Sequence, residues 1–270
     1  MSDFLILKTD HYKFKIKVSN NTLYNKIISK YFLLGDESQP CLSFILYTKE
    51  AQEIMGNDII YTANLMNIER LKECIMNDVS HEYFEKYSSN IELLNEFLKY
   101  IKNNYSYIKE IKLNDSTYIP CNKTDTLDLL SYYIALHGKT WYEDKYNAYS
   151  KDNYDKYKEQ LKNYISKEFK SKISWDIFYA KYILLGSNFA KNIIDNNFEM
   201  CKNIFEISKT FPEFFNSINK KIIREYKCIF FKSWLEQFII DTIKIPREWF
   251  IPLHQKGGKS KSKNYKKSTR

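Results

Sequence analysis

The chain has 270 residues, of which 44% are apolar, 17% aromatic and 28% charged, a composition that excludes a disordered protein. Its net charge is +9, but the last fifteen residues carry seven positive charges and no negative one, which leaves the other 255 residues at +2. Basicity is therefore a property of the C-terminal tail, and contact with a polyanion is expected there. No run approaches the ~20 apolar residues of a membrane span, and Asp3 and Lys8 interrupt any secretory signal.

Cysteines, histidines and glycines offer little material for a reactive or metal site. The five cysteines are odd in number and widely spaced, without a CxxC pair, so we expect reduced, mostly buried thiols and a cytosolic protein. The four histidines are far apart and form no zinc signature, so no metal site is predicted. Only four glycines precede the tail, too few to favour a phosphate-cradling loop.

The first third of the chain mixes strand and helix patterns. Residues 4–8 and 12–18 are predicted strands, the second with Tyr12, Phe14, Ile16 and Val18 on one face and three lysines on the other. A helix capped by Asn21 or Thr22 is expected to run to about Phe32. Strands are predicted over residues 41–48 and 59–67, whereas residues 69–87 fit either a strand followed by a helix or a loop.

The middle of the chain alternates helix, strand and helix. Apolar residues at helical spacing predict a helix of about 14 residues from Ile91, ended by Asn103 and Asn104. Residues 108–113 alternate as a strand, which Asn114, Asp115 and Ser116 close. A second helix is expected from the capping cluster at residues 124–126 to Gly138. This order indicates an α/β layer arrangement.

From residue 151 onward the pattern is helical. Three apolar stripes, over residues 154–165, 193–205 and 214–238, predict helices, with Pro212 in the first turn of the third. Pro246 and Pro252 are expected to end the regular structure. We therefore divide the chain into a mixed domain (1–150), a helical domain or extension (151–255) and a disordered basic tail (256–270).

Two segments are compared with phosphate-binding motifs, and nucleotide triphosphate binding is rejected for the first. Residues Gly138, Lys139 and Thr140 resemble the end of a nucleotide-binding P-loop, but the position that needs the earlier glycine is Tyr133, and a helix precedes the motif. Gly138 is therefore predicted to end a helix. The tail can contact nucleic acid through counterion release, without sequence preference. Its candidate nucleic-acid-binding residues are Lys256, Lys259, Lys261, Lys263, Lys266, Lys267 and Arg270.

Residues 91–149 carry a resemblance to a known family. The helix IELLNEFLKYIKNN, the strand ending at residues 113–116, the following helix and residues 138–143 resemble an uncharacterised family of large nucleocytoplasmic (giant) DNA viruses. The Gly-Gly and Lys/Ser-rich C-terminus is similar to tails of giant-virus proteins, and the Lys-, Asn-, Ile- and Tyr-rich composition is typical of an AT-rich genome.

The same segment resembles the second half of a GNAT acetyltransferase. Residues 141–146 (WYEDKY) resemble that family's C-terminal aromatic element, and the resemblance implies that Tyr142 protonates the departing CoA thiolate. It also places the pyrophosphate-binding loop at residues 86–90, where Ser88, Ser89 and Asn90 would hold the cofactor through backbone N–H groups. This loop contains no glycine, unlike the family's, so the resemblance implies a degenerate acetyltransferase-like segment.

The expected fold is α/β (α+β): a GNAT-like mixed sheet of about five strands with flanking helices, then an α-helical C-terminal half. The expected function is that of a viral binding or structural module. The alternatives are an active acetyl-CoA-dependent N-acetyltransferase, with acetyl-CoA as cofactor, and a virion-associated protein whose tail contacts nucleic acid or an acidic surface. Without acetyl transfer no cofactor is expected, and the expected location is the host cytoplasm or viral factory, or the virion.

Overall fold

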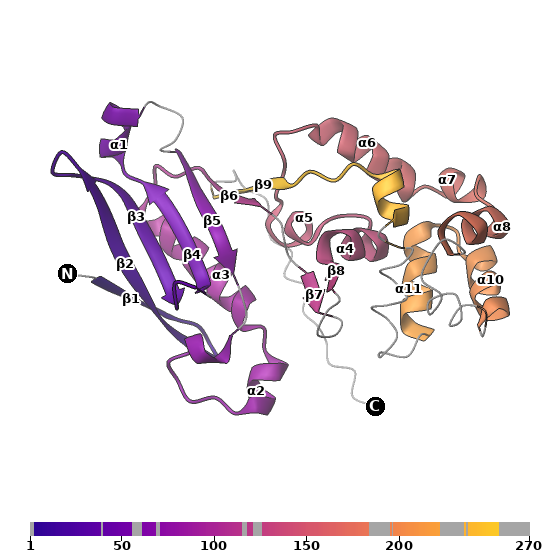
Figure 1. Cartoon of the computed structure of the whole chain (residues 1–270), viewed down its shortest axis with the longest axis horizontal. Coiled ribbons are helices and arrows are strands. Elements are labelled where there is room, and N and C mark those ends of the chain that lie inside the picture. Colours follow the sequence, from indigo (N-terminus) through magenta and orange to yellow (C-terminus); the bar gives the residue numbers. More distant parts are fainter. Residues whose placement is uncertain are drawn as a thin grey trace. The chain divides into compact units, whose positions relative to one another are not determined.

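The structure is a computed structural model that describes residues 3–38, 40–55, 61–68, 71–114, 118–120, 126–183, 195, 197–221, 235 and 237–253. The chain separates into two compact units (Figure 1). Unit one comprises residues 1–111 and the chain from Pro252 on, and unit two comprises Lys112–Ile251. The two units change over at residues 111 and 251, and the division at residues 150 and 255, drawn from the helical pattern and the charge of the tail, stays a prediction.

Unit one is built on consecutive antiparallel strands. These are β1 (Asp3–Lys8), β2 (Lys13–Leu23), β3 (Lys26–Gly35), β4 (Pro40–Tyr47) and β5 (Thr62–Ile68). Among the described residues, the strand order is β1-β2-β3-β4-β5-β6-β9. Strand β6 (Glu110–Asn114) spans the boundary between the units, and β9 (Glu248–Pro252) belongs to unit two except for its last residue. The α+β class is confirmed, with seven strands where about five were expected.

The predicted helix over residues 22–32 is wrong, because β2 and β3 form a tight hairpin there. Tyr24 and Asn25 join the strands with positive φ angles of 49° and 60°. Two consecutive residues of this kind are typical of a type I′ turn, whose twist matches that of the flanking strands. Cross-strand pairing therefore overrides the capping pattern of Asn21 and Thr22, which lie within β2.

Helix α3 (Ser89–Asn104) covers one face of this sheet. The Phe97 ring lies 5.3 Å from that of Phe32 and 4.8 Å from that of Phe44, and all three side chains are buried. Phe32 pairs with Val18, which places it on the face of β2 that also carries Phe14 and Ile16. In Figure 1, α3 lies behind the strands. The predicted helix and the alternating strand are thus confirmed.

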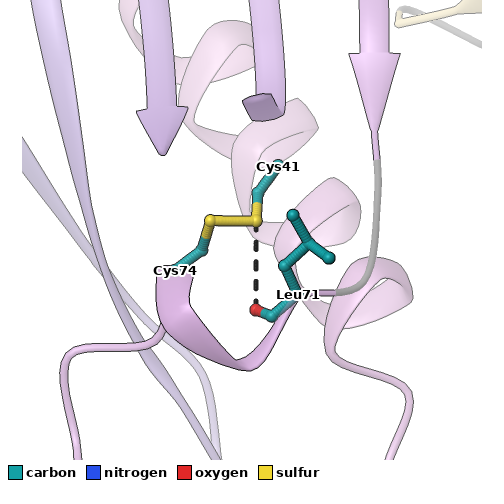
Figure 2. Close-up of a disulfide and its surroundings, with 3 residues drawn as sticks. All are labelled: Cys41, Leu71 and Cys74. Atoms are coloured by element: carbon teal, nitrogen blue, oxygen red, sulfur yellow. Dashed lines mark hydrogen bonds between the residues drawn. A yellow bond between two sulfur atoms is a disulfide. The ribbon is translucent and has the colours of Figure 1, made fainter. Parts of the chain in front are cut away.

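Cys41 and Cys74 form a disulfide, which corrects the expectation of reduced thiols for these two residues, whereas Cys201 is a free, buried thiol as expected (Figure 2). Cys41 is the second residue of β4, and Cys74 ends the short 3₁₀ helix η2 (Lys72–Cys74), with 6.4 Å between their Cα atoms. Cys41 Sγ also lies 3.9 Å from the carbonyl oxygen of Leu71 (Figure 2). The two cysteines are 33 residues apart, so only tertiary folding brings them together.

The ambiguous stretch over residues 69–87 is neither a strand nor one long helix in its described part. After η2, Ile75 forms a bridge with Phe14, and the Met76 N–H donates to the Lys13 carbonyl at 2.8 Å. Helix α2 (His81–Lys86) follows, capped by the Ser80 side chain. Helix α1 (Lys49–Met55) completes the described helices of unit one.

Unit two is mainly helical. A hairpin of β7 (Tyr118–Pro120) and β8 (Thr126–Asp128) precedes α4 (Leu129–His137), which begins at the Asp128 N-cap and not at residues 124–126. Gly138 ends α4 in the left-handed region, at φ 65°, as predicted. Further helices in the described part of unit two are α5 (Trp141–Tyr146), α6 (Tyr154–Tyr164), α7 (Lys167–Ser171), α8 (Trp175–Phe178), the π-helical η3 (Tyr179–Ile183), α10 (Phe198–Ile207) and α11 (Phe211–Lys221). Residues 237–242 are also helical.

Aromatic side chains form the core of unit two. The Phe211 ring lies 4.6 Å from Phe238 and 5.9 Å from Phe178, and all three are fully buried. Regular structure does not end at Pro246, since β9 follows it with Trp249 and Phe250 buried. Among the described residues, no helix is both long and apolar enough to cross a bilayer.

Candidate functional site

The predicted site residues fall in different parts of the chain. Ser88, Ser89 and Asn90 lie together at the start of α3 in unit one. Tyr142 is the second residue of α5 in unit two. The seven basic residues of the tail, from Lys256 to Arg270, lie outside the described residues.

The start of α3 is closed by its own side chains. Ser88 is the N-cap residue, but its side chain accepts no capping bond and instead donates to Asn90 Oδ1 at 2.7 Å. The same Asn90 oxygen accepts from the Ile91 N–H at 3.0 Å. Ser89 is buried, with 3% of its surface exposed. One backbone N–H that a bound phosphate would need is therefore already engaged.

A carboxylate lies in the first turn of the same helix. Glu92 Oε1 is 2.5 Å from Nδ1 of His11, which comes from the turn between β1 and β2. Glu92 Oε2 is buried and has no hydrogen-bond partner among the described residues. Helix N-termini favour negative charge, and the His11 ring supplies one further partner.

Contacts from several segments hold His11 in place. Thr9 Oγ1 accepts from the backbone N–H groups of His11 at 3.2 Å and Tyr12 at 2.8 Å, which fixes the β1–β2 turn. Asn77 Nδ2 donates to the His11 carbonyl at 3.1 Å. The imidazole stacks on Tyr87, with ring centroids 4.0 Å apart and planes at 21°. Together with Glu92, these contacts leave the ring little freedom.

A cleft of about 430 Å³ lies beside this pair. One wall is a face of α3 with Glu92, Asn95, Glu96 and Lys99 at helical spacing, and the other is formed by residues 8–10. Lys99 pairs with Glu96 at 3.3 Å on the exposed side. The lining is polar and includes no thiol. Its hydroxyl group, that of Thr9, accepts a hydrogen bond within the β1–β2 turn. The cleft can therefore take a polar ligand, through the amines of Lys8 and Lys99 and the carboxylates beside them.

In unit two, Tyr142 lies in a short helix held by a capping box. Its side chain is 7% exposed and its ring meets that of Trp141 edge-on at 5.1 Å. Thr140 caps α5, and Glu143 Oε2 accepts from the Thr140 N–H at 2.9 Å. The same oxygen accepts from the Tyr157 hydroxyl at 2.7 Å. Burial, followed by the Glu143 charge, raises the pKa of Tyr157 far above its ordinary value.

A second polar cluster surrounds Asp144. Its carboxylate pairs with Lys139, and with Lys145 at 3.1 Å, and accepts from the Tyr133 hydroxyl at 2.8 Å. The bond from Lys139 is the largest cause that lowers the pKa of Asp144. Burial raises the pKa of Tyr133 to about 12 and lowers that of His137, whose ring lies 4.2 Å from Tyr133. These groups are mutually satisfied, as in a structural network.

Sequence reasoning missed His11 and Glu92. They are 81 residues apart, and neither sits in a local motif that marks histidine or glutamate as functional. Only the proximity of the β1–β2 turn and α3 pairs them. The described residues contain no group of three or more metal-ligating side chains. Comparison with protein-family models, curated proteins and solved structures finds no match to this chain.

Proposed function

We propose that this protein is a binding module whose acetyltransferase-like layer has lost acetyl transfer. The proposal is carried by the first turn of α3, where the Glu92 carboxylate lies beside the predicted pyrophosphate site. One carboxylate oxygen already engages His11, and the other is buried without a partner among the described residues. A pyrophosphate at this turn would meet like charge, which disfavours binding.

The surroundings of Tyr142 support the same proposal. A general acid must reach the atom that it protonates, directly or through one water. The Tyr142 side chain is 93% buried, and the next two residues of α5 are committed to the capping box and to lysine pairs. Tyr142 therefore fits a core residue better than a proton donor to a CoA thiolate.

The viral setting is part of the proposal and depends on sequence alone. The AT-rich composition and the Gly-Gly and Lys/Ser-rich tail support a giant-virus protein that acts as a structural or binding component. Such a role needs no cofactor, and the polar cleft beside His11 gives it a place for a partner group.

A calorimetric titration of the full-length protein with acetyl-CoA tests the loss of acetyl transfer. We expect no binding at cofactor concentrations up to the millimolar range, for the wild type and for Tyr142→Phe alike. Glu92→Gln serves as a matched variant, because it removes the charge and keeps the shape; weak binding that appears only there would support the repulsion argument. Micromolar binding by the wild type, with turnover that Tyr142→Phe abolishes while binding persists, would establish the acetyltransferase instead.

A second candidate function, contact with nucleic acid through the tail, is favoured by the charge distribution. Seven of the nine net positive charges lie in the last fifteen residues. The test compares DNA binding by the full-length chain and by a chain ending at Gln255, across a salt series. Truncation should weaken binding and flatten its salt dependence. Equal affinities would reject the tail as the contact.

A further inference from the structure

We propose that the open face of the β1–β2 hairpin binds single-stranded nucleic acid. This ligand class is that of the proposed binding module, and the inference rests on the proposed function in one respect, that the protein binds a ligand without catalysing a reaction. We call this surface the basic face, defined by the outward side chains of β1 and β2: Phe4, Ile6, Lys8, Lys13, Lys15 and Lys17. Lys8, at the end of β1, also lines the cleft beside α3.

Strand register places these six side chains on one face. Phe4 pairs with Lys17, Ile6 with Lys15, and Lys8 with Lys13, and directly opposite residues of an antiparallel pair share a face. The intervening pair of Leu7 and Phe14 is buried on the other side. Because α3 occupies that other side, through Phe97 against Phe32, the basic face is the side of the sheet that α3 leaves uncovered.

The basic face is accessible to a ligand. Phe4 is 56% exposed and Ile6 43% exposed, and the side chain of Lys17 is 42% exposed. Further along the sheet, β3 and β4 differ, since Leu33 and Cys41 on the same side are buried near η2. The opening is therefore confined to the first two strands.

Charge on this face is of one sign. Strands β1 and β2 contain four lysines and a single acidic residue, Asp3, although the chain without its tail is nearly neutral. Lys17 pairs only loosely with Glu37, at 3.8 Å on the surface, and no ion pair is found for Lys13 or Lys15 among the described residues. The folded body thus concentrates positive charge where an anionic strand can reach it.

An exposed aromatic ring beside regularly spaced cations is the arrangement that single strands require. Lysines at alternate positions of β2 are about 7 Å apart along the strand, so each can meet a successive backbone phosphate. Lys15 Nζ lies over one face of the Phe4 ring, 4.2 Å from its centroid, so an unstacked base would take the other face or displace this lysine toward a phosphate. A duplex keeps its bases stacked and cannot use that ring, which favours a single strand.

The test measures the anisotropy of a labelled oligothymidylate of roughly 15 nucleotides. All variants are full-length, in a background with the seven tail cations changed to glutamine, so that the tail and the basic face are judged separately. The triple variant K13Q/K15Q/K17Q is compared with K156Q/K162Q/K167Q, which removes three exposed lysines of unit two. Circular dichroism and thermal melting confirm that both remain folded.

Loss of three phosphate contacts should reduce the slope of log affinity against log salt by about 2, at about 0.7 per contact. If the plots of log affinity against log salt for the triple variant and its tail-neutralised parent converge near 1 M salt, affinity at 0.1 M falls about 100-fold. The unit-two control should keep the affinity of the tail-neutralised parent. Phe4→Leu should weaken binding at least about fivefold through lost stacking.

Equal binding by the two triple variants would overturn the proposal, as would an absence of oligonucleotide binding in the tail-neutralised background. A duplex bound as tightly as the single strand would also overturn it. Binding to phosphatidylserine vesicles but not to the oligonucleotide would show an anionic membrane as the ligand instead. None of these outcomes bears on acetyl-CoA, so the two proposals fail separately.

Discussion

Reduction of the Cys41–Cys74 disulfide is expected to lower the free energy of unfolding of unit one by about 4 kcal/mol. The bond closes a loop with a sequence separation of 33 residues. In the chain-entropy description, closing such a loop removes about 12 cal/mol/K from the unfolded chain, or about 3.7 kcal/mol at 25 °C. The double variant Cys41→Ala/Cys74→Ala should show the same loss without reductant.

The assay is a guanidinium titration read by hydrogen exchange and mass spectrometry in β2 and residues 71–78. With a slope of several kcal/mol per molar, the midpoint of these peptides should fall by about 1 M on reduction. The bond from the Met76 N–H to Lys13 should become less protected. All four tryptophans lie between residues 112 and 251, so their fluorescence reports on unit two and serves as the internal control.

Two results would refute this reasoning. One is an identical midpoint for the wild type with and without reductant. The other is alkylation of both Cys41 and Cys74 in the native, unreduced protein, which would show free thiols. The double variant should not respond to reductant, and a response would trace the effect to another site.

Three further substitutions test unit two. Glu143→Ala removes the capping box and the acceptor of the buried Tyr157 hydroxyl. It should lower the free energy of unfolding, followed by tryptophan fluorescence, by about 3 kcal/mol, against less than about 0.5 kcal/mol for Glu159→Ala at an exposed site. Equal losses in the two variants would contradict the network. Gly138→Ala should lower the free energy of unfolding by more than the roughly 1–2 kcal/mol of a non-glycine residue in the left-handed region, because the new Cβ also meets the Ile165 side chain. In a denaturant titration, adding Ile165→Ala should remove the part of the loss that comes from this clash. Lys170 is buried against the Phe205 ring, and burial lowers its pKa from 10.5 to about 8. Between pH 8 and 10.5 the unfolded chain therefore binds more protons at this lysine than the folded protein does, so the free energy of unfolding should rise with pH in that range. Thermal melts of Lys170→Met should lack that rise, and a wild-type melting temperature that falls from pH 8 to 9 relative to the variant would contradict the sign.

The elements that could be predicted are those whose pattern is local. Alternation over residues 12–18 and the helical stripe from Ile91 correspond to β2 and α3, and Gly138 ends α4 as its lack of a side chain permits. The failures share one cause. Residues 22–32 contain capping side chains, but pairing with β2 and β4 decides their conformation. Strand β9 has no clear pattern of its own between Pro246 and Pro252, and it is a strand because it pairs with β6 in the sheet.

Less of the candidate site could be predicted. The resemblance pointed to residues 88–90, and these do begin a helix, but the pairing of His11 with Glu92 in the same turn has no signature in the sequence. Reduced thiols were expected because the cysteines are odd in number and widely spaced, but spacing along the chain does not show which two residues folding brings together.

Sequence alone determined that Lys13, Lys15 and Lys17 point the same way, because side chains alternate along a strand whatever surrounds it. It also determined that the tail holds most of the net charge. Tertiary structure decided which face of the sheet α3 covers and which lysines stay outward as a group. It also brought His11 of the β1–β2 turn against Glu92 in the first turn of α3. The physical reason is that periodicity depends on neighbouring residues, whereas packing and pairing depend on contacts between residues far apart in the chain.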